Sequence, residues 1–190
     1  EKGGGDGQKK YASAHAVVDR DGSCWQIVPF NIKARHAGTS RWKGLDSLNQ
    51  YSIGIEMANY GWLDKQGDGN YSRSGETPVF KPADVVLGTM PGSTEMRGWE
   101  PYPEPQLSAV EQLVATLIDK YPAISEVLGH QEISPGRKFD PGPAFPMQRF
   151  RNLIDNRGFG AMERTSVPAE PALDRLITST RLNIREGAGT

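Results

Sequence analysis

The chain has 190 residues, enough for one sizeable domain and part of another. Its 22 basic and 23 acidic side chains give a formal net charge of −1, which argues against a nucleic-acid partner. No apolar run approaches the roughly 20 residues that a membrane-spanning helix needs. The 22 glycines and 14 prolines are typical of a loop-rich globular enzyme, and we expect a monomer without a membrane span.

The first part of the chain predicts a loop and then a β-hairpin. Residues 1–10 are polar and glycine-rich, which is typical of a loop. Two short strands are predicted over 14–19 and 24–28, and the Asp-Gly pair between them favours a tight turn. His15 lies on the first strand, where a histidine is more often a satisfied core or edge residue than a ligand.

A central strand is predicted over residues 49–57, with the sequence NQYSIGIEM. Its alternation places Ile53 and Ile55 on one face and Glu56 on the other. Gly54 leaves room above the strand beside Glu56. A carboxylate at this place is costly unless a cation, a metal or water accompanies it, so Glu56 is either a functional group or the structural partner of an arginine.

The second half of the chain predicts an insertion and two helices. Residues 60–105 show little periodicity and are expected to form a long surface insertion, of the kind that often shapes the groove of a hydrolase. Apolar residues at helical spacing predict one helix over 107–121 and a second over 145–157. Both helices are expected to pack against the sheet.

The stretch 129–143, GHQEISPGRKFDPGP, concentrates the chemistry of the chain. Its Pro-Gly pairs predict a stiff, sharply bent loop. His130 and Asp140 offer a nitrogen and a carboxylate, a combination that suits zinc, and Lys138 adds a cation two residues before Asp140. Read without any resemblance, the same residues also fit a surface loop with ordinary salt bridges.

Two segments resemble the N-acetylmuramoyl-L-alanine amidases, the family that also contains the peptidoglycan recognition proteins. One is the loop just described, with its His, PGRK and DPGP. The other runs from Ser13 to Glu56, with a Ser-Ala-His strand, a His-Ala-Gly segment and a Ser-Ile-Gly-Ile-Glu strand. The resemblance covers roughly residues 11–157. It implies an α/β fold in which a central mixed β-sheet is flanked by helices.

The resemblance also implies a set of site residues. His130 and Asp140 match the family's zinc ligands, and Glu56 matches the glutamate that assists the zinc-bound water. Lys138 would stabilise the oxyanion that develops during amide hydrolysis. Three further residues match positions near the site or along the substrate groove: His15, His36 and Trp42.

The function that the resemblance implies is zinc-dependent hydrolysis of the amide bond between N-acetylmuramic acid and L-alanine, in peptidoglycan or in its muropeptide fragments. The alternative is a binding module of the same fold that has lost catalysis, and a third possibility is an interaction domain without a cell-wall ligand. A periplasmic, secreted or phage-lysin-like protein is favoured over a cytoplasmic one.

A third zinc ligand is not evident in the sequence. Family members use a further histidine on an early strand that is followed by a helix, and the fourteen residues before His15 contain neither. We expect that strand and helix to lie upstream in a longer protein, which would leave a sheet edge uncovered. The alternative is that His15 or His36 serves as the third ligand.

The C-terminal part departs from the amidase pattern. We expect an amidase catalytic domain over residues 1–158, truncated at its start, and a proline-bearing linker over 159–175. Residues 176–190 resemble the first strand and turn of a bacterial SH3-like domain.

Overall fold

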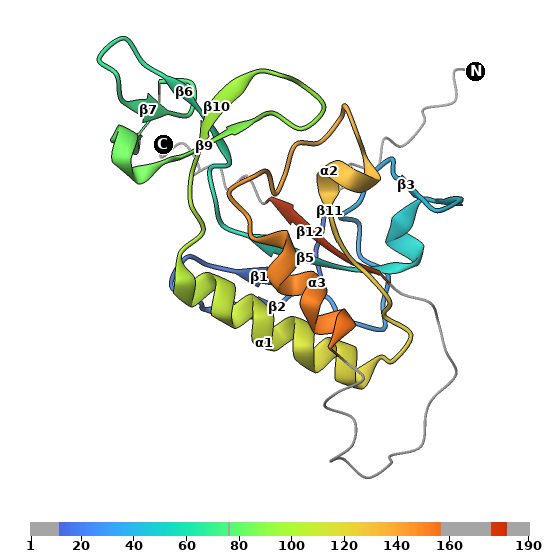
Figure 1. Cartoon of the computed structure of the whole chain (residues 1–190). Helices are drawn as coiled ribbons and strands as arrows, with labels where there is room; N and C mark the ends of the chain where they lie inside the picture. Colours follow the sequence, from blue (N-terminus) through green and yellow to red (C-terminus); the bar gives the residue numbers. More distant parts are fainter. Residues whose placement is uncertain (1–11, 76, 157–175, 182–190) are drawn as a thin grey trace, which may run out of the picture.

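The fold is built on a five-stranded mixed sheet (Figure 1). The computed structural model describes residues 12–75, 77–156 and 176–181. The strand order is β11-β12-β5-β1-β2, with β2 antiparallel to β1 and the other pairs parallel. The sheet and its helices confirm the expected α/β class. Its strands are β1 (Ala16–Val18), β2 (Cys24–Gln26), β5 (Ser52–Met57), β11 (Val127–Gly129) and β12 (Leu176–Arg181).

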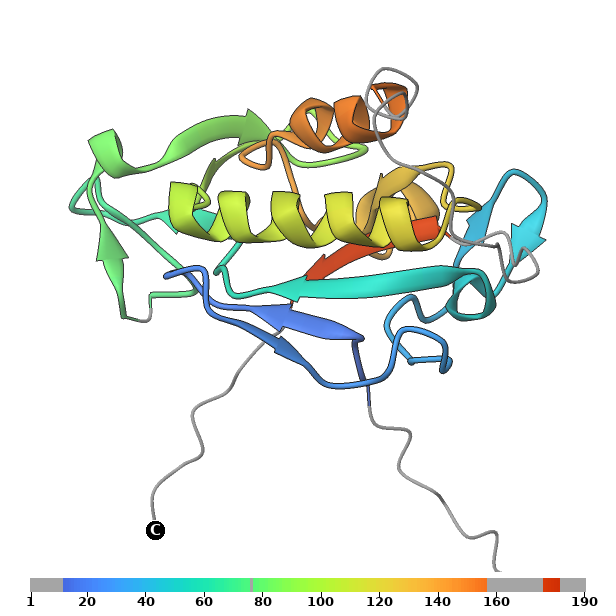
Figure 2. The same ribbon diagram turned by 90° about the horizontal axis from the view of Figure 1, so that it is seen from below.

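Two helices, α1 (Glu104–Lys120) and α3 (Met147–Asp155), cover one face of this sheet (Figure 2). The alternation predicted for β5 turns Ile53 and Ile55 toward them, and both are buried. Burying such a side chain contributes roughly 1.5–3 kcal/mol. α1 begins at Glu104, earlier than predicted, because a proline is tolerated in the first turn of a helix. Other members of this core are Val18, Met57, Val110, Val114, Leu117, Ile118, Val127 and Phe150.

The opposite face of the sheet carries a smaller apolar cluster of Ala37, Leu48, Leu128 and Ile133. These residues come from the loop after β2, from β11 and from the single turn of helix α2 (His130–Ile133). This face therefore brings the segment around residue 37 above the end of β11. The remaining elements on this side are β3 (Arg41–Trp42), β4 (Leu45–Asp46) and the 3₁₀ helix η1 (Leu48–Gln50).

Most of the predicted surface insertion forms a second sheet, which the sequence reasoning missed. It is antiparallel, with the order β8-β7-β6-β10-β9, and lies beyond one end of the main sheet (Figure 1). Its strands have two to four residues, too short to show a period of two. They are β6 (Trp62–Lys65), β7 (Tyr71–Ser72), β8 (Val79–Phe80), β9 (Val86–Thr89) and β10 (Met96–Trp99), with the 3₁₀ helix η2 (Pro82–Asp84).

Buried polar side chains join the two sheets. Glu100 is 1 % exposed; it accepts a hydrogen bond from the backbone N–H of Tyr60 at 2.5 Å and pairs with Arg20 of the β1–β2 turn. Gln106 donates its side-chain amide to the carbonyl oxygens of Val18 (3.1 Å) and Ala58 (3.0 Å), where β1 and β5 end. Glu100 thereby fixes the second sheet to the main sheet, and Gln106 fixes α1 to the ends of β1 and β5.

Strand β12 belongs to the main sheet, although its residues follow the expected linker. It pairs with β5 along all six of its residues and with β11 along three, so β5 has a neighbour on both sides. The sheet position that we expected to be uncovered is therefore occupied, and the sheet does not end at residue 158. Residues 159–175 and 182–190 lie outside the described part of the chain, so the linker and the SH3-like domain stay predictions. Among the described residues, no helix is long and apolar enough to cross a membrane.

The place of β12 predicts that a chain ending at residue 160 is less stable than one ending at residue 181. Without β12, the facing backbone groups of β5 and β11 lose their partners, and each buried unpaired group costs about 1–3 kcal/mol. A total loss of about 3 kcal/mol would lower Tm by roughly 10 °C. Thermal melts of the two truncated chains and the complete chain measure the difference. Equal melts at 160 and 181 would contradict a role for β12 in the sheet and support a boundary near residue 158.

Candidate active site

His130 and Asp140 meet at the start of α2, as the sequence predicts. His130 Nδ1 lies 3.1 Å from Asp140 Oδ2, and His130 Nε2 lies 3.0 Å from the carbonyl oxygen of Ala37. The His130 side chain is 2 % exposed and that of Asp140 is 13 % exposed. A buried imidazole thus lies between two oxygen acceptors.

This arrangement fits a metal ion. A neutral imidazole carries one N–H, so either tautomer leaves one ring nitrogen with its lone pair toward an oxygen. When Nε2–H donates to Ala37, the lone pair of Nδ1 faces the Asp140 carboxylate and is repelled by it. A cation between Nδ1 and Asp140 would remove this repulsion. Two ligands of a tetrahedral zinc lie about 3.3 Å apart, close to the 3.1 Å observed between Nδ1 and Oδ2. The carbonyl would then fix the ring orientation, as the outer partners of metal-bound histidines do.

Arg137 fastens the loop to the segment above it, and the sequence reasoning gave it no role. Its Nη2 donates to the carbonyl oxygens of Ala37 at 2.7 Å and Thr39 at 2.8 Å, and lies 3.3 Å from His130 Nε2. Ser134 Oγ donates to the same Thr39 carbonyl at 2.7 Å. These bonds hold the Ala37 carbonyl against His130. The signal was present in the motif PGRK, but its arginine reads as an ordinary surface cation.

The other end of the loop is fixed by the second sheet. Gly142 has a φ of +74° and lies under Trp99, where a Cβ atom would come within 2.2 Å of the ring, so glycine is required there. Tyr102 OH donates to the carbonyl oxygen of Pro141 at 3.1 Å. Within the loop, Gln131 N–H donates to the Asp140 carbonyl at 2.8 Å. Asp140 is therefore held from both sides.

Lys138 supplies positive charge beside Asp140. Burial raises the pKa of Asp140, but the hydrogen bond with His130 and the charges of His130 and Lys138 outweigh it, and the pKa lies below its usual value. Lys138 is half-buried, and its ammonium makes no hydrogen bond or ion pair within the described part of the chain. Its ammonium is thus available to a ligand.

Glu56 lies level with His130 on the same face of the sheet. The register aligns Gly129 with Ser179 of β12 and Ser179 with Ile55, so the residues that follow, His130 and Glu56, share a row. One strand separates them, which places their backbones about 10 Å apart. Glu56 is 7 % exposed and opposite the apolar face of β5, as expected from the alternation.

His15 and His36 are both buried, so their expected place along the substrate groove stays a prediction. His15 is 1 % exposed; its Nδ1 accepts from Gly54 N–H, and its Nε2 donates to the Ile32 carbonyl, both at 2.9 Å. His36 covers Gly54, filling the room expected there. Burial, and then the charges of His15 and His130, lower the pKa of His36 to about 3 against a hydrogen bond with Ser52, so its ring is neutral at pH 7.

Trp42 lines a different cavity from the one beside the metal pair, our name for His130 and Asp140 as candidate metal ligands. Its indole N–H donates to Glu126 Oε2 at 2.9 Å, and it lines a separate cavity with residues of β11, α2 and α3. The expectation that Trp42 borders the substrate groove stays a prediction. Trp42 lies on the two-residue strand β3, which pairs with β4.

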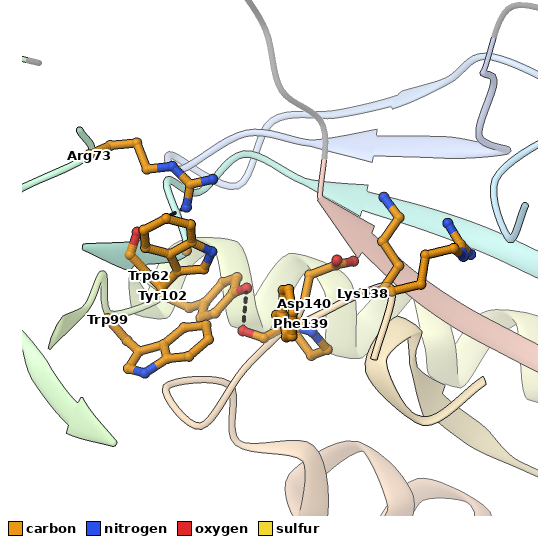
Figure 3. Close-up of a pocket in the computed structure, with 10 residues that line it drawn as sticks. Trp62, Arg73, Trp99, Tyr102, Lys138, Phe139 and Asp140 are labelled. Carbon is orange, nitrogen blue, oxygen red and sulfur yellow. Dashed lines mark hydrogen bonds between the residues drawn. The ribbon is translucent and has the colours of Figure 1, made fainter. Parts of the chain in front are cut away.

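A pocket of about 140 Å³ adjoins Asp140 and Lys138 (Figure 3). One wall is the loop and the other comes from the second sheet and the segment before α1. The sequence shows these aromatic residues only as scattered tryptophans and tyrosines, because the strands that gather them could not be predicted. The lining residues are Gly61, Trp62, Arg73, Trp99, Tyr102 and residues 137–141.

Two of the described residues, His130 and Asp140, are candidate metal ligands. No group of three His, Cys, Asp or Glu side chains able to hold a metal is found among them. His15 uses both ring nitrogens in backbone hydrogen bonds, and His36 hydrogen-bonds through Nε2 with Ser52 at 3.3 Å. Strand β12, which lies between Glu56 and His130, has the sequence LITSTR and brings none of these residue types. A relocated histidine ligand is therefore not supported.

Curated relatives of the chain are amidases. It is 34 % identical over 143 residues to the 1,6-anhydro-N-acetylmuramyl-L-alanine amidase AmpD of Salmonella typhimurium, covering 75 % of this chain and 57 % of AmpD. It is 33 % identical over 138 residues to the N-acetylmuramoyl-L-alanine amidase AmiD of Escherichia coli, covering 72 % of this chain and 38 % of AmiD. The chain thus spans little more than half the length of the AmpD relatives.

Solved structures of these two amidases have the same fold. A selenomethionine derivative of AmpD matches with a TM-score of 0.52 at 33 % identity, over 77 % of this chain and 62 % of that one. AmiD from E. coli, in complex with anhydro-N-acetylmuramic acid-L-Ala-D-γ-Glu-L-Lys, matches with a TM-score of 0.56 at 28 % identity, over 85 % and 58 %. The family described as N-acetylmuramoyl-L-alanine amidase matches residues 3–143, and the chain belongs to this family.

Proposed function

We propose that this protein hydrolyses the amide bond between N-acetylmuramic acid and L-alanine in muropeptides, with zinc held by His130 and Asp140. The observation that carries the proposal is the pair of ligand atoms 3.1 Å apart, with Lys138 on one side and Glu56 in the same row. Family membership and the muropeptide bound to AmiD support the substrate class.

Each residue has a role that its position supports. Zinc, when bound, lowers the pKa of its water to about 7 and polarises the amide carbonyl. Glu56 accepts the proton of the attacking water on its carboxylate and passes it to the leaving nitrogen of L-alanine. The Lys138 ammonium stabilises the oxyanion on the former carbonyl oxygen. Arg137 and the Ala37 carbonyl hold the imidazole of His130 in orientation.

The alternative is a muropeptide-binding module without catalysis. A binder needs neither a proton acceptor nor an oxyanion partner, whereas this chain keeps His130, Asp140, Lys138 and Glu56 together. The pair of ligands favours the enzyme, although two protein ligands should hold zinc more weakly than the three usual in catalytic sites. Zinc binding and amide cleavage are therefore measured together.

We expect Glu56→Gln to separate metal binding from catalysis. Zinc affinity, measured by calorimetry, should stay at the wild-type value because Glu56 is not a ligand. Cleavage of anhydro-N-acetylmuramyl-L-Ala-D-γ-Glu-L-Lys in zinc-saturating buffer should fall by about 10²–10⁴-fold because the proton acceptor is lost. Asp140→Ala should abolish zinc binding, and Glu126→Gln, a carboxylate of the separate cavity, should change neither measurement.

Undiminished cleavage by Glu56→Gln would remove Glu56 from the mechanism. A wild-type protein that binds the muropeptide without cleaving it would favour the binding module.

We expect Lys138→Ala to lower kcat far more than it raises KM. The ammonium is needed mainly when charge develops on the oxygen, and losing one such donor costs on the order of 3 kcal/mol, or about 10²-fold in kcat. Lys65→Ala is a matched control because that lysine is exposed on β6 and outside the pocket. Steady-state kinetics give both constants. A change confined to KM would instead make Lys138 a substrate-binding residue.

A further inference from the structure

The pocket beside the metal pair has cationic side chains on both of its walls. Its charged lining consists of Arg73, Arg137 and Lys138 against the single carboxylate of Asp140. Arg137 donates hydrogen bonds to the carbonyl oxygens of Ala37 and Thr39, and Lys138 adjoins Asp140. Arg73 belongs to the second sheet and lies across the pocket from Asp140 and Lys138 (Figure 3). The mechanism proposed above uses Lys138 and Arg137 but assigns nothing to Arg73.

The guanidinium of Arg73 lies over an aromatic ring. Its Cζ lies 3.6 Å from the centre of the Trp62 ring, and its Nη1 donates to the Trp62 carbonyl oxygen at 3.1 Å. Stacking of this kind fixes the plane of a guanidinium and reduces the entropy lost when it binds a ligand. Arg73 therefore presents an oriented group suited to a planar anion.

A second arginine lies over the same ring. The Cζ of Arg97 lies 4.6 Å from the Trp62 ring centre, and its guanidinium pairs with the carboxylates of Asp64 and Glu95. Arg97 does not line the pocket, whereas Arg73 does, so it is position beside the pocket that selects Arg73.

The substrate proposed above carries an anion near the scissile bond. A γ-linked glutamate uses its side-chain carboxyl in the peptide and leaves its α-carboxylate ionised. One residue, L-alanine, separates this glutamate from the amide that is cleaved, so the carboxylate lies about two residues, or roughly 7 Å, from that bond. A subsite for it must adjoin the metal pair, and a single pocket is lined by both Asp140 and Arg73.

We propose that Arg73, stacked on Trp62, binds the α-carboxylate of the γ-linked glutamate of the stem peptide. This assignment rests on the proposed function for the direction of the substrate, and it makes the second sheet a specificity element. Two N–H groups of a guanidinium match the two oxygens of a carboxylate, which a carboxamide cannot reproduce. The site should thus prefer glutamate over isoglutamine at this position.

The test compares two substrates that differ in one group. They are anhydro-N-acetylmuramyl-L-Ala-D-γ-Glu-L-Lys and the analogue with a carboxamide in place of the glutamate α-carboxylate. We expect kcat/KM of the wild type to be at least about tenfold higher for the acid. Arg73→Gln should lose this preference by slowing cleavage of the acid alone, and Arg97→Gln should keep it. Equal rates on both substrates in the wild type, or an equal loss on both in Arg73→Gln, would overturn the assignment.

A binding measurement separates this proposal from the proposed function. The tripeptide L-Ala-D-γ-Glu-L-Lys and its carboxamide are titrated into zinc-free wild type, Arg73→Gln and Arg97→Gln and followed by NMR. If no muropeptide is cleaved, the hydrolase proposal fails, while tighter binding of the acid that is lost only in Arg73→Gln still supports the subsite. Cleavage together with no difference in binding between acid and carboxamide would reject the subsite and leave the hydrolase proposal standing. Thermal melts confirm that each variant is folded.

Discussion

The contact between His130 and two oxygen acceptors is the constraint on which this site depends. Ala37 presents a carbonyl to one ring nitrogen, and Asp140 presents a carboxylate to the other. A neutral imidazole cannot donate to both; Arg137 Nη2, 3.3 Å from Nε2, brings positive charge to one side of the ring, and a metal ion between Nδ1 and Asp140 would bring it to the other. Much of the surrounding structure serves to hold these three groups at their distances. Arg137 fixes the carbonyl, and the Pro-Gly turns fix the carboxylate.

The second sheet extends this constraint from the loop to the substrate side. Trp99 covers Gly142 and Tyr102 bonds the Pro141 carbonyl, so the strands that brace Asp140 also build the pocket beside it. Because Glu100 fastens the same sheet to the β1–β2 turn, its position depends on the main sheet and not on the loop alone. One insertion thus both supports a metal ligand and lines the space where a ligand would bind.

Local patterns in the sequence predicted the elements that are long or sharply bounded. The Asp-Gly turn gave the β1–β2 hairpin, the alternation of Ile53 and Ile55 gave β5, and the apolar stripe gave α1. The loop motif correctly joined His130 with Asp140. The strands of the second sheet were missed because two to four residues cannot show a period, and their stability comes from pairing across distant segments.

The side chains on the polar face of β5 show why residue type alone could not assign the site. His36 is buried over Gly54 as a neutral ring, while Glu56 lies on β5 in the row that leads to His130. The place of Glu56 follows from strand register, which only long-range pairing determines. Parallel pairing of β11, β12 and β5 is therefore what brings two separate motifs to one part of the sheet. Between them β12 contributes backbone but no metal-binding residue type, so the proposed chemistry rests on residues that follow or lie on the strands to either side of it.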